Sequence, residues 1–217
     1  STIDPSNEVT EQWVAIGQVE LAEGRYGAAK RAFDEAVSKA HGGLLNCGGR
    51  LGSAYCCFRQ GKFTEALEHY GEVLTSLGSD GCPNYVRLAM AACYLQQKRH
   101  DMAERCYRRV AELDASSAEA KAGLGALGVL SLKPEEVESG LKMLMEAFEL
   151  NPHLPFVLSS ACEQLYNRGD YASVARLSRA VLDSKPLEPS IKAEAYYYLG
   201  MVCHLRDQQE QALALFR

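Results

Sequence analysis

The chain has 217 residues, 47% of them hydrophobic, and a formal net charge of −5 at pH 7. Such a charge gives no electrostatic reason for a nucleic acid to bind, so we expect no direct nucleic-acid ligand. No apolar run approaches the roughly 20 residues that cross a bilayer, and we therefore expect no membrane segment.

A helix, a glycine turn and a second helix form the first predicted element, over residues 10–46. Gly17 lies on the first helix, the turn follows at Gly24, and the second helix carries Ala29 and Phe33. The small residues stand where two helix backbones must approach closely, and the aromatic residue can fill the space between neighbouring units.

The same pattern recurs along the whole chain. The small residue near the start of each second helix returns in steps of 37, 37, 37, 34 and 38 residues, at Ala29, Ala66, Ala103, Gly140, Val174 and Ala212. One turn further on stand Phe33, Tyr70, Tyr107, Leu144, Ser178 and Phe216. A helix–turn–helix with a period near 34 residues resembles the tetratricopeptide repeat.

This resemblance implies an all-α fold, a solenoid in which helical hairpins coil into a right-handed superhelix. A lone hairpin cannot bury its apolar face, so each unit needs a neighbour. We expect one domain over residues 1–217 with six repeats, at 10–46, 47–83, 84–117, 118–154, 155–192 and, incomplete, 193–217. Because the chain stops within a helix, we expect it to be a fragment of a longer solenoid.

The fourth repeat departs from the pattern, and the fifth matches it weakly at Ser178. Gly123, Gly125 and Gly128 on one helix indicate close approach by another backbone, either the neighbouring helix, which we favour, or a ligand. Asp170 precedes the second helix of the fifth repeat, where it can cap the helix N-terminus.

Neither the cysteines nor any motif indicates chemistry. The eight cysteines include no C-x-x-C spacing, so we expect buried, reduced thiols in an intracellular protein, without disulfides or metal. Metalloprotease, phosphate-loop and serine-hydrolase motifs are absent from the sequence. We therefore expect no enzyme, no cofactor and no small-molecule substrate.

The predicted site is the concave face, which the tetratricopeptide resemblance assigns to the first helix of each repeat. We expect an extended or helical protein segment to bind there, because an exposed apolar strip commonly marks a partner site. The candidate residues are Val14, Gln18, Leu21, Leu51, Tyr55, Phe58, Tyr85, Leu88, Leu95, Phe156, Tyr166, Tyr197 and Met201. Tetratricopeptide co-chaperones clamp acidic C-termini with Lys and Asn, whereas Val14, Gln18, Gly52, Tyr85 and Ala89 stand at the matching places here.

A narrower resemblance covers about residues 47–217. The features that carry it are Gly81-Cys82-Pro83 leading into Val86-Arg87-Leu88, Ala103-Glu104-Arg105, the long turn before Gly140-Leu141, Ala147-Phe148 before Asn151-Pro152, Asp170-Tyr171 and Ala193-Glu194-Ala195-Tyr196. In this order they resemble the large tetratricopeptide subunit of the RNA polymerase II-associated factor (Paf) complex. The chain departs from that family at Ser159–Cys162, where the family has an Asn- and His-rich helix.

The Paf resemblance implies a nuclear scaffold that gathers the other subunits of a transcription-elongation complex, which supports histone modification. Two alternatives stay open at this point. The chain can instead be a tetratricopeptide segment of another multiprotein assembly, or the substrate-recruiting arm of a larger enzyme.

Overall fold

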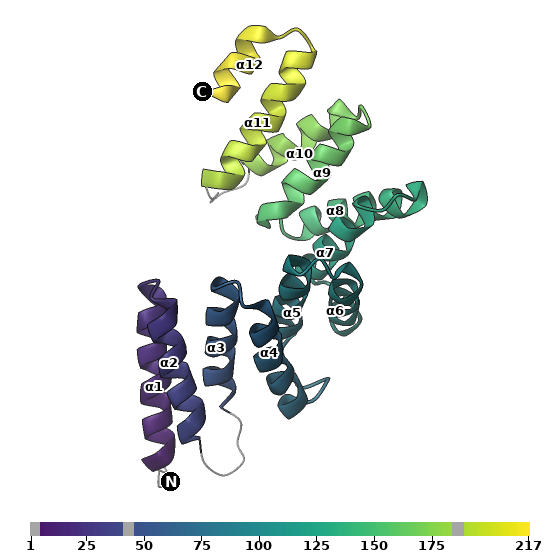
Figure 1. Cartoon of the computed structure of the whole chain (residues 1–217). Coiled ribbons are helices and arrows are strands. Elements are labelled where there is room, and N and C mark those ends of the chain that lie inside the picture. Colours follow the sequence, from purple (N-terminus) through teal and green to yellow (C-terminus); the bar gives the residue numbers. More distant parts are fainter. Residues whose placement is uncertain (1–4, 41–45, 184–188) are drawn as a thin grey trace. The chain divides into compact units, whose positions relative to one another are not determined.

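The computed structural model describes residues 5–40, 46–183 and 189–217 (Figure 1). These residues form twelve α-helices and no strand. The helices are α1 (Pro5–Ala22), α2 (Tyr26–Lys39), α3 (Cys47–Arg59), α4 (Phe63–Leu77), α5 (Asn84–Gln96), α6 (His100–Leu113), α7 (Ala118–Val129), α8 (Pro134–Leu150), α9 (Pro155–Asn167), α10 (Tyr171–Asp183), α11 (Pro189–Leu205) and α12 (Gln209–Phe216). The prediction of an all-α fold is therefore confirmed.

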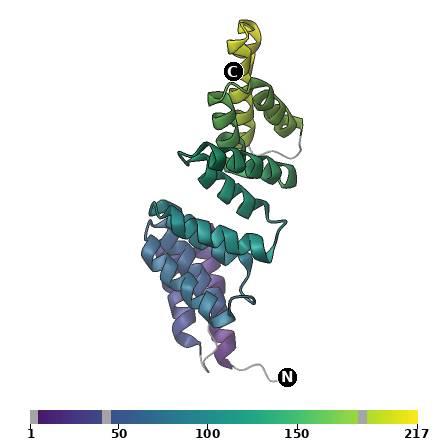
Figure 2. The same cartoon turned by 90° about the vertical axis from the view of Figure 1, so that its right-hand side faces the viewer.

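The chain divides into two compact units, unit 1 over Ser1–Leu113 and unit 2 over Asp114–Arg217. Within unit 1 each helix from α1 to α6 packs against the next, and α1 also contacts α3. Within unit 2 consecutive helices pack in the same way, α7 contacts α9, and α9 contacts α11. Figures 1 and 2 show this stacking of helical hairpins within each unit. The boundaries of the six repeats and the single domain remain predictions.

The core of unit 1 depends on glycines that leave room for an aromatic ring. A Cβ atom on Gly17 of α1 would lie 2.6 Å from the Phe33 ring, and one on Gly52 of α3 would lie 2.5 Å from it. Phe33, on α2, is 2% exposed. In unit 2 Gly200 and Phe216 are separated along the chain by as many residues as Gly17 and Phe33, and a Cβ on Gly200 would lie 2.6 Å from the Phe216 ring. Small residues on first helices therefore accommodate aromatic rings from second helices.

Helices α7 and α8 approach each other backbone to backbone. A Cβ on Gly125 would lie 2.8 Å from the carbonyl oxygen of Gly140, and a Cβ on Gly128 would lie 2.9 Å from the Cα of Gly140. The backbone that approaches the glycine-rich helix is thus the neighbouring helix. Of the two explanations that the sequence left open for these glycines, the structure supports the packing of helices.

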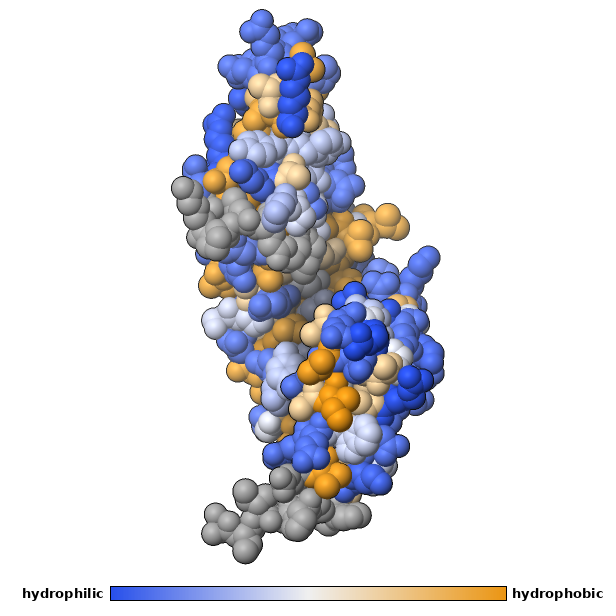
Figure 3. Space-filling model, turned by 90° about the vertical axis from the view of Figure 1, so that its left-hand side faces the viewer, coloured by the Kyte–Doolittle hydropathy of each residue, from blue (hydrophilic) through white to orange (hydrophobic). Residues whose placement is uncertain are grey.

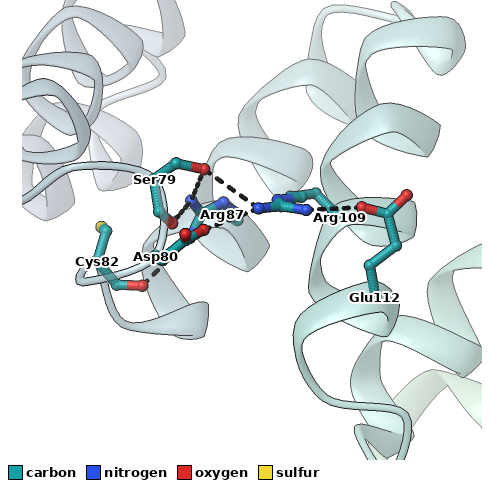
Figure 4. A network of polar contacts seen from close by, with 6 residues as sticks. All are labelled: Ser79, Asp80, Cys82, Arg87, Arg109 and Glu112. Atoms are coloured by element: carbon teal, nitrogen blue, oxygen red, sulfur yellow. Dashed lines mark hydrogen bonds and ion pairs between the residues drawn. The ribbon is translucent and has the colours of Figure 1, made fainter.

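A buried arginine organises the loop between α4 and α5 (Figure 4). Arg87 is 4% exposed; its Nη1 donates to the carbonyl oxygen of Cys82 at 3.2 Å, and its Nη2 donates to the carbonyl oxygen of Ser79. A buried guanidinium is costly unless its donors find acceptors. Here the backbone carbonyls of the loop supply them, and the loop is held against the start of α5.

A second arginine holds the same loop from α6 (Figure 4). Arg109 pairs with Asp80 of the loop at 2.9 Å and with Glu112 of its own helix at 2.9 Å. Both carboxylates are largely exposed, so the pairs contribute modestly to stability. Together with Arg87 they set the entry into α5, on whose first turn Tyr85 stands.

Candidate protein-binding surface

Four of the six predicted residues on α1 and α3 contribute part of their surface to the core of unit 1. Val14 and Leu21 are half-buried and pack against the cluster that contains Phe33. Leu51 and Phe58 are half-buried and pack against a second cluster, formed mainly by α3, α4 and α5. The ring of Phe58 also meets that of Phe63 edge-on, with the centroids 5.6 Å apart. Only the remaining surface of these side chains is available to a partner.

The other predicted residues of unit 1 are more accessible. Tyr55 is 39% exposed and Tyr85 is 55% exposed, and Gln18 is exposed as well. Leu88 and Leu95 on α5 are half-buried. Two tyrosines are thus the large side chains that the first helices of unit 1 present to solvent at the predicted positions.

Three of the predicted residues lie around one hollow of about 390 Å³ in unit 1. Its lining comes from three helices and consists of Gln18, Leu21, Ala22, Tyr26, Tyr55 and Arg59. The structure therefore brings Gln18, Leu21 and Tyr55 together. It adds Ala22, Tyr26 and Arg59, which the sequence analysis missed.

The guanidinium of Arg59 lies between the two tyrosines of this hollow. Its central carbon is 4.8 Å from the ring centroid of Tyr26 and 5.9 Å from that of Tyr55. Its Nη1 donates a hydrogen bond to the Tyr55 hydroxyl at 3.0 Å, and this bond raises the pKa of Arg59. The spacing of four residues between Tyr55 and Arg59 on one helix could have indicated their contact. Nothing in the sequence pattern connects either residue with Tyr26.

In unit 2 the predicted residues also differ in exposure. Tyr197 is 53% exposed, and its ring centroid lies 6.1 Å from that of Phe216. Tyr166 is half-buried against Tyr171, with centroids 5.3 Å apart, and Met201 is half-buried. The side chain of Phe156 lies outside the described residues.

Apolar residues of α1 other than the predicted ones are also exposed. Val9 is 41% exposed, Ile16 45% and Val19 58%. In Figure 3 hydrophobic residues lie among hydrophilic ones on the face of unit 1 that α1 forms.

The described part of the chain contains no group of three His, Cys, Asp or Glu side chains that could hold a metal ion. All eight cysteines are free, and burial raises the pKa of the Cys162 thiol to about 12. Among the helices that the structure describes, none is long and apolar enough to cross a membrane.

The stacked helical hairpins define a tetratricopeptide-repeat fold, a fold that serves as a scaffold for protein–protein interaction. Two family models, each described as Tetratricopeptide repeat, match residues 14–80 and 85–117. The chain is 29% identical over 203 residues to Protein CTR9 homolog of Arabidopsis thaliana, covering 92% of this chain and 18% of that protein. It is 23% identical over 201 residues to Tetratricopeptide repeat protein 1 of Schizosaccharomyces pombe, covering 87% and 18%. The chain thus spans about a fifth of the length of these relatives.

Solved structures agree on the fold. The structure of pilF from Pseudomonas aeruginosa superimposes with a TM-score of 0.74 at 14% identity, covering 98% of this chain and 90% of that one. A chain of the APC/C hetero-tetramer Cut9–Hcn1 superimposes with a TM-score of 0.69 at 12% identity, covering 96% of this chain and 40% of that one. At these identities the likeness concerns the fold alone.

Proposed function

We propose that this chain is a segment of a CTR9-type scaffold subunit of the Paf complex and that it acts in the nucleus during transcription elongation by RNA polymerase II. The observation that carries the proposal is the 29% identity over 203 residues to the CTR9 homolog. CTR9 is a Paf complex subunit. The sequence features from Gly81 to Tyr196 resemble the same family.

In this proposal the chain holds a segment of another Paf subunit on the first helices of its repeats. Each unit offers exposed aromatic rings on such a helix, Tyr55 and Tyr85 in unit 1 and Tyr197 in unit 2. Tyrosine is enriched at protein interfaces because its ring buries a large apolar area while its hydroxyl forms hydrogen bonds. The half-buried residues Leu88 and Met201 add apolar contacts beside these rings.

Co-expression with the name-giving subunit of the Paf complex tests the proposal. The tagged 217-residue chain should capture that subunit, and a Tyr55→Ala, Tyr85→Ala double variant should capture it at least about tenfold less well, because two exposed anchors are lost. Leu132→Ser is the matched control, since Leu132 is fully exposed on the turn between α7 and α8 and lies outside the proposed surface.

The two parts of the proposal fail separately. Absence of capture by the unchanged chain, with the Paf subunits present and soluble, would reject the assignment to the Paf complex. Undiminished capture by the double variant would keep that assignment and reject the first-helix face of unit 1 as the binding surface.

A further inference from the structure

The hollow between α1, α2 and α3 contains a cation without an acidic partner. Within the described residues Arg59 contacts the Tyr26 and Tyr55 rings and donates to the Tyr55 hydroxyl, and it forms no ion pair. Arg25, on the turn between α1 and α2, is by contrast paired with two glutamates. Arg59 is therefore the cation that remains free to bind a carboxylate from outside.

The tyrosines hold this guanidinium in place. A guanidinium has five N–H donors in a planar fork, and Arg59 uses one of them on the Tyr55 hydroxyl. Stacking over the Tyr26 ring restricts the plane of the fork, so that less rotational freedom is lost when a carboxylate binds. Arginine binds carboxylates through two parallel hydrogen bonds in this way.

The remainder of the hollow suits the rest of a peptide. Leu21 and Ala22 contribute apolar surface to its lining, and the exposed amide of Gln18 can bond to a peptide backbone. A volume of about 390 Å³ lies near the lower end of the range for ligand pockets, which is roughly 300–1,000 Å³. This space suits a short stretch of polypeptide better than a bulky ligand.

We propose that this hollow binds an Asp or Glu side chain within a partner protein segment, with the carboxylate on Arg59 and an adjoining apolar side chain on Leu21 and Ala22. The proposal rests on the protein-binding function of the first-helix face and specifies the chemistry of its partner. Arg59 is the single basic side chain in the lining, whereas nucleic-acid binding requires several phosphate contacts. The Lys and Asn clamp for a C-terminal carboxylate is absent from this sequence, which favours an internal acidic side chain.

Selection from a library of random peptides displayed with both ends fused tests this inference. The 217-residue chain and its Arg59→Gln variant are immobilised in parallel. The unchanged chain should enrich peptides in which Asp or Glu adjoins Leu, Ile, Val or Phe, and the variant should lose this enrichment. Thermal unfolding of the variant must match that of the unchanged chain, since Arg59 is exposed.

A double-mutant cycle then measures the contact directly. The most enriched peptide is synthesised with acetylated and amidated ends, so that its side chains supply the only carboxylate. Exchanging its acidic residue for the amide, or Arg59 for Gln, should each weaken binding about tenfold by fluorescence polarisation, and both changes together should weaken it no further. Arg99→Gln is the matched control, because Arg99 stacks on Tyr94 at 5.1 Å outside the hollow.

Three outcomes would overturn the inference: no acidic enrichment on the unchanged chain, the same enrichment on the Arg59→Gln chain, or additive effects in the cycle. Enriched peptides that lack acidic residues and lose affinity on Tyr85→Ala would reject the carboxylate site but leave the protein-binding function standing. A carboxylate site that passes this test while the Paf subunit is not captured would reject only the assignment to the Paf complex.

Discussion

Replacing Gly140 by alanine tests the close contact of α7 and α8. The new Cβ would lie 2.8 Å from the carbonyl oxygen of Gly125, 2.8 Å from the backbone nitrogen of Val129 and 2.9 Å from the carbonyl carbon of Gly128. All three are backbone atoms of the facing helix, which cannot move aside as a flexible side chain can. The two helices must separate for alanine to fit.

The magnitude follows from two opposing terms. Alanine in a helix interior is more favourable than glycine by about 1 kcal/mol. Overpacking typically costs about 1–3 kcal/mol, and contact with rigid backbone places this site near the upper end. We therefore expect Gly140→Ala to lower the free energy of unfolding by about 2 kcal/mol. At Gly71, in the interior of α4, a Cβ would meet nothing within 4 Å, so Gly71→Ala should raise it by about 1 kcal/mol.

Urea unfolding followed by far-UV circular dichroism measures both variants against the unchanged chain. The same chemical change should act in opposite directions at the two sites, with a difference of about 3 kcal/mol. If Gly140→Ala were as stable as the unchanged chain, or if both variants shifted equally, the reasoning about backbone contact between α7 and α8 would be refuted.

Three further changes test other parts of the structure by urea unfolding. Arg87→Met should cost about 1–3 kcal/mol because two loop carbonyls lose their donors, whereas the exposed Arg108→Met should change little; equal effects would contradict the buried network. Asp170→Ala should cost about 1 kcal/mol at pH 7, because Asp170 accepts the N–H of Ser173 at 3.1 Å as an N-cap. Hydrogen bonds from the Ser173 hydroxyl and N–H lower the pKa of Asp170 below its ordinary value of 3.8. The stability that Asp170 contributes is therefore present above pH 3.8 and is lost as the pH falls through the lowered pKa. A difference in unfolding free energy between Asp170→Ala and the unchanged chain that persists in stronger acid would contradict this role. Lys98, on the turn between α5 and α6, has a φ of 58°, a left-handed conformation that glycine adopts more easily than lysine. Lys98→Gly should therefore raise the free energy of unfolding by roughly 1 kcal/mol, and a decrease would contradict backbone strain at this turn.

Several features of the molecule could be predicted from the sequence because they depend on local spacing. The helical hairpins follow from apolar residues and glycine turns that recur with one period, and the cap at Asp170 follows from its place before a helix. The close approach at Gly125 and Gly128 could be expected because glycine costs stability in a helix and needs a packing reason. The predicted binding surface rests on the tetratricopeptide resemblance, whose register identifies one face of each first helix but not how much of each side chain the core covers.

The sequence by itself therefore determined the class of fold, because the residues that define each helical hairpin recur in every repeat. Only the tertiary structure decided that Tyr26, Tyr55 and Arg59 share one hollow and that Arg87 is buried on loop carbonyls. The physical reason is that cation–aromatic and buried polar contacts join residues on different elements, and their geometry depends on how the helices pack. The repeat period does not give the distance and angle at which neighbouring helices pack, whereas the tertiary structure does.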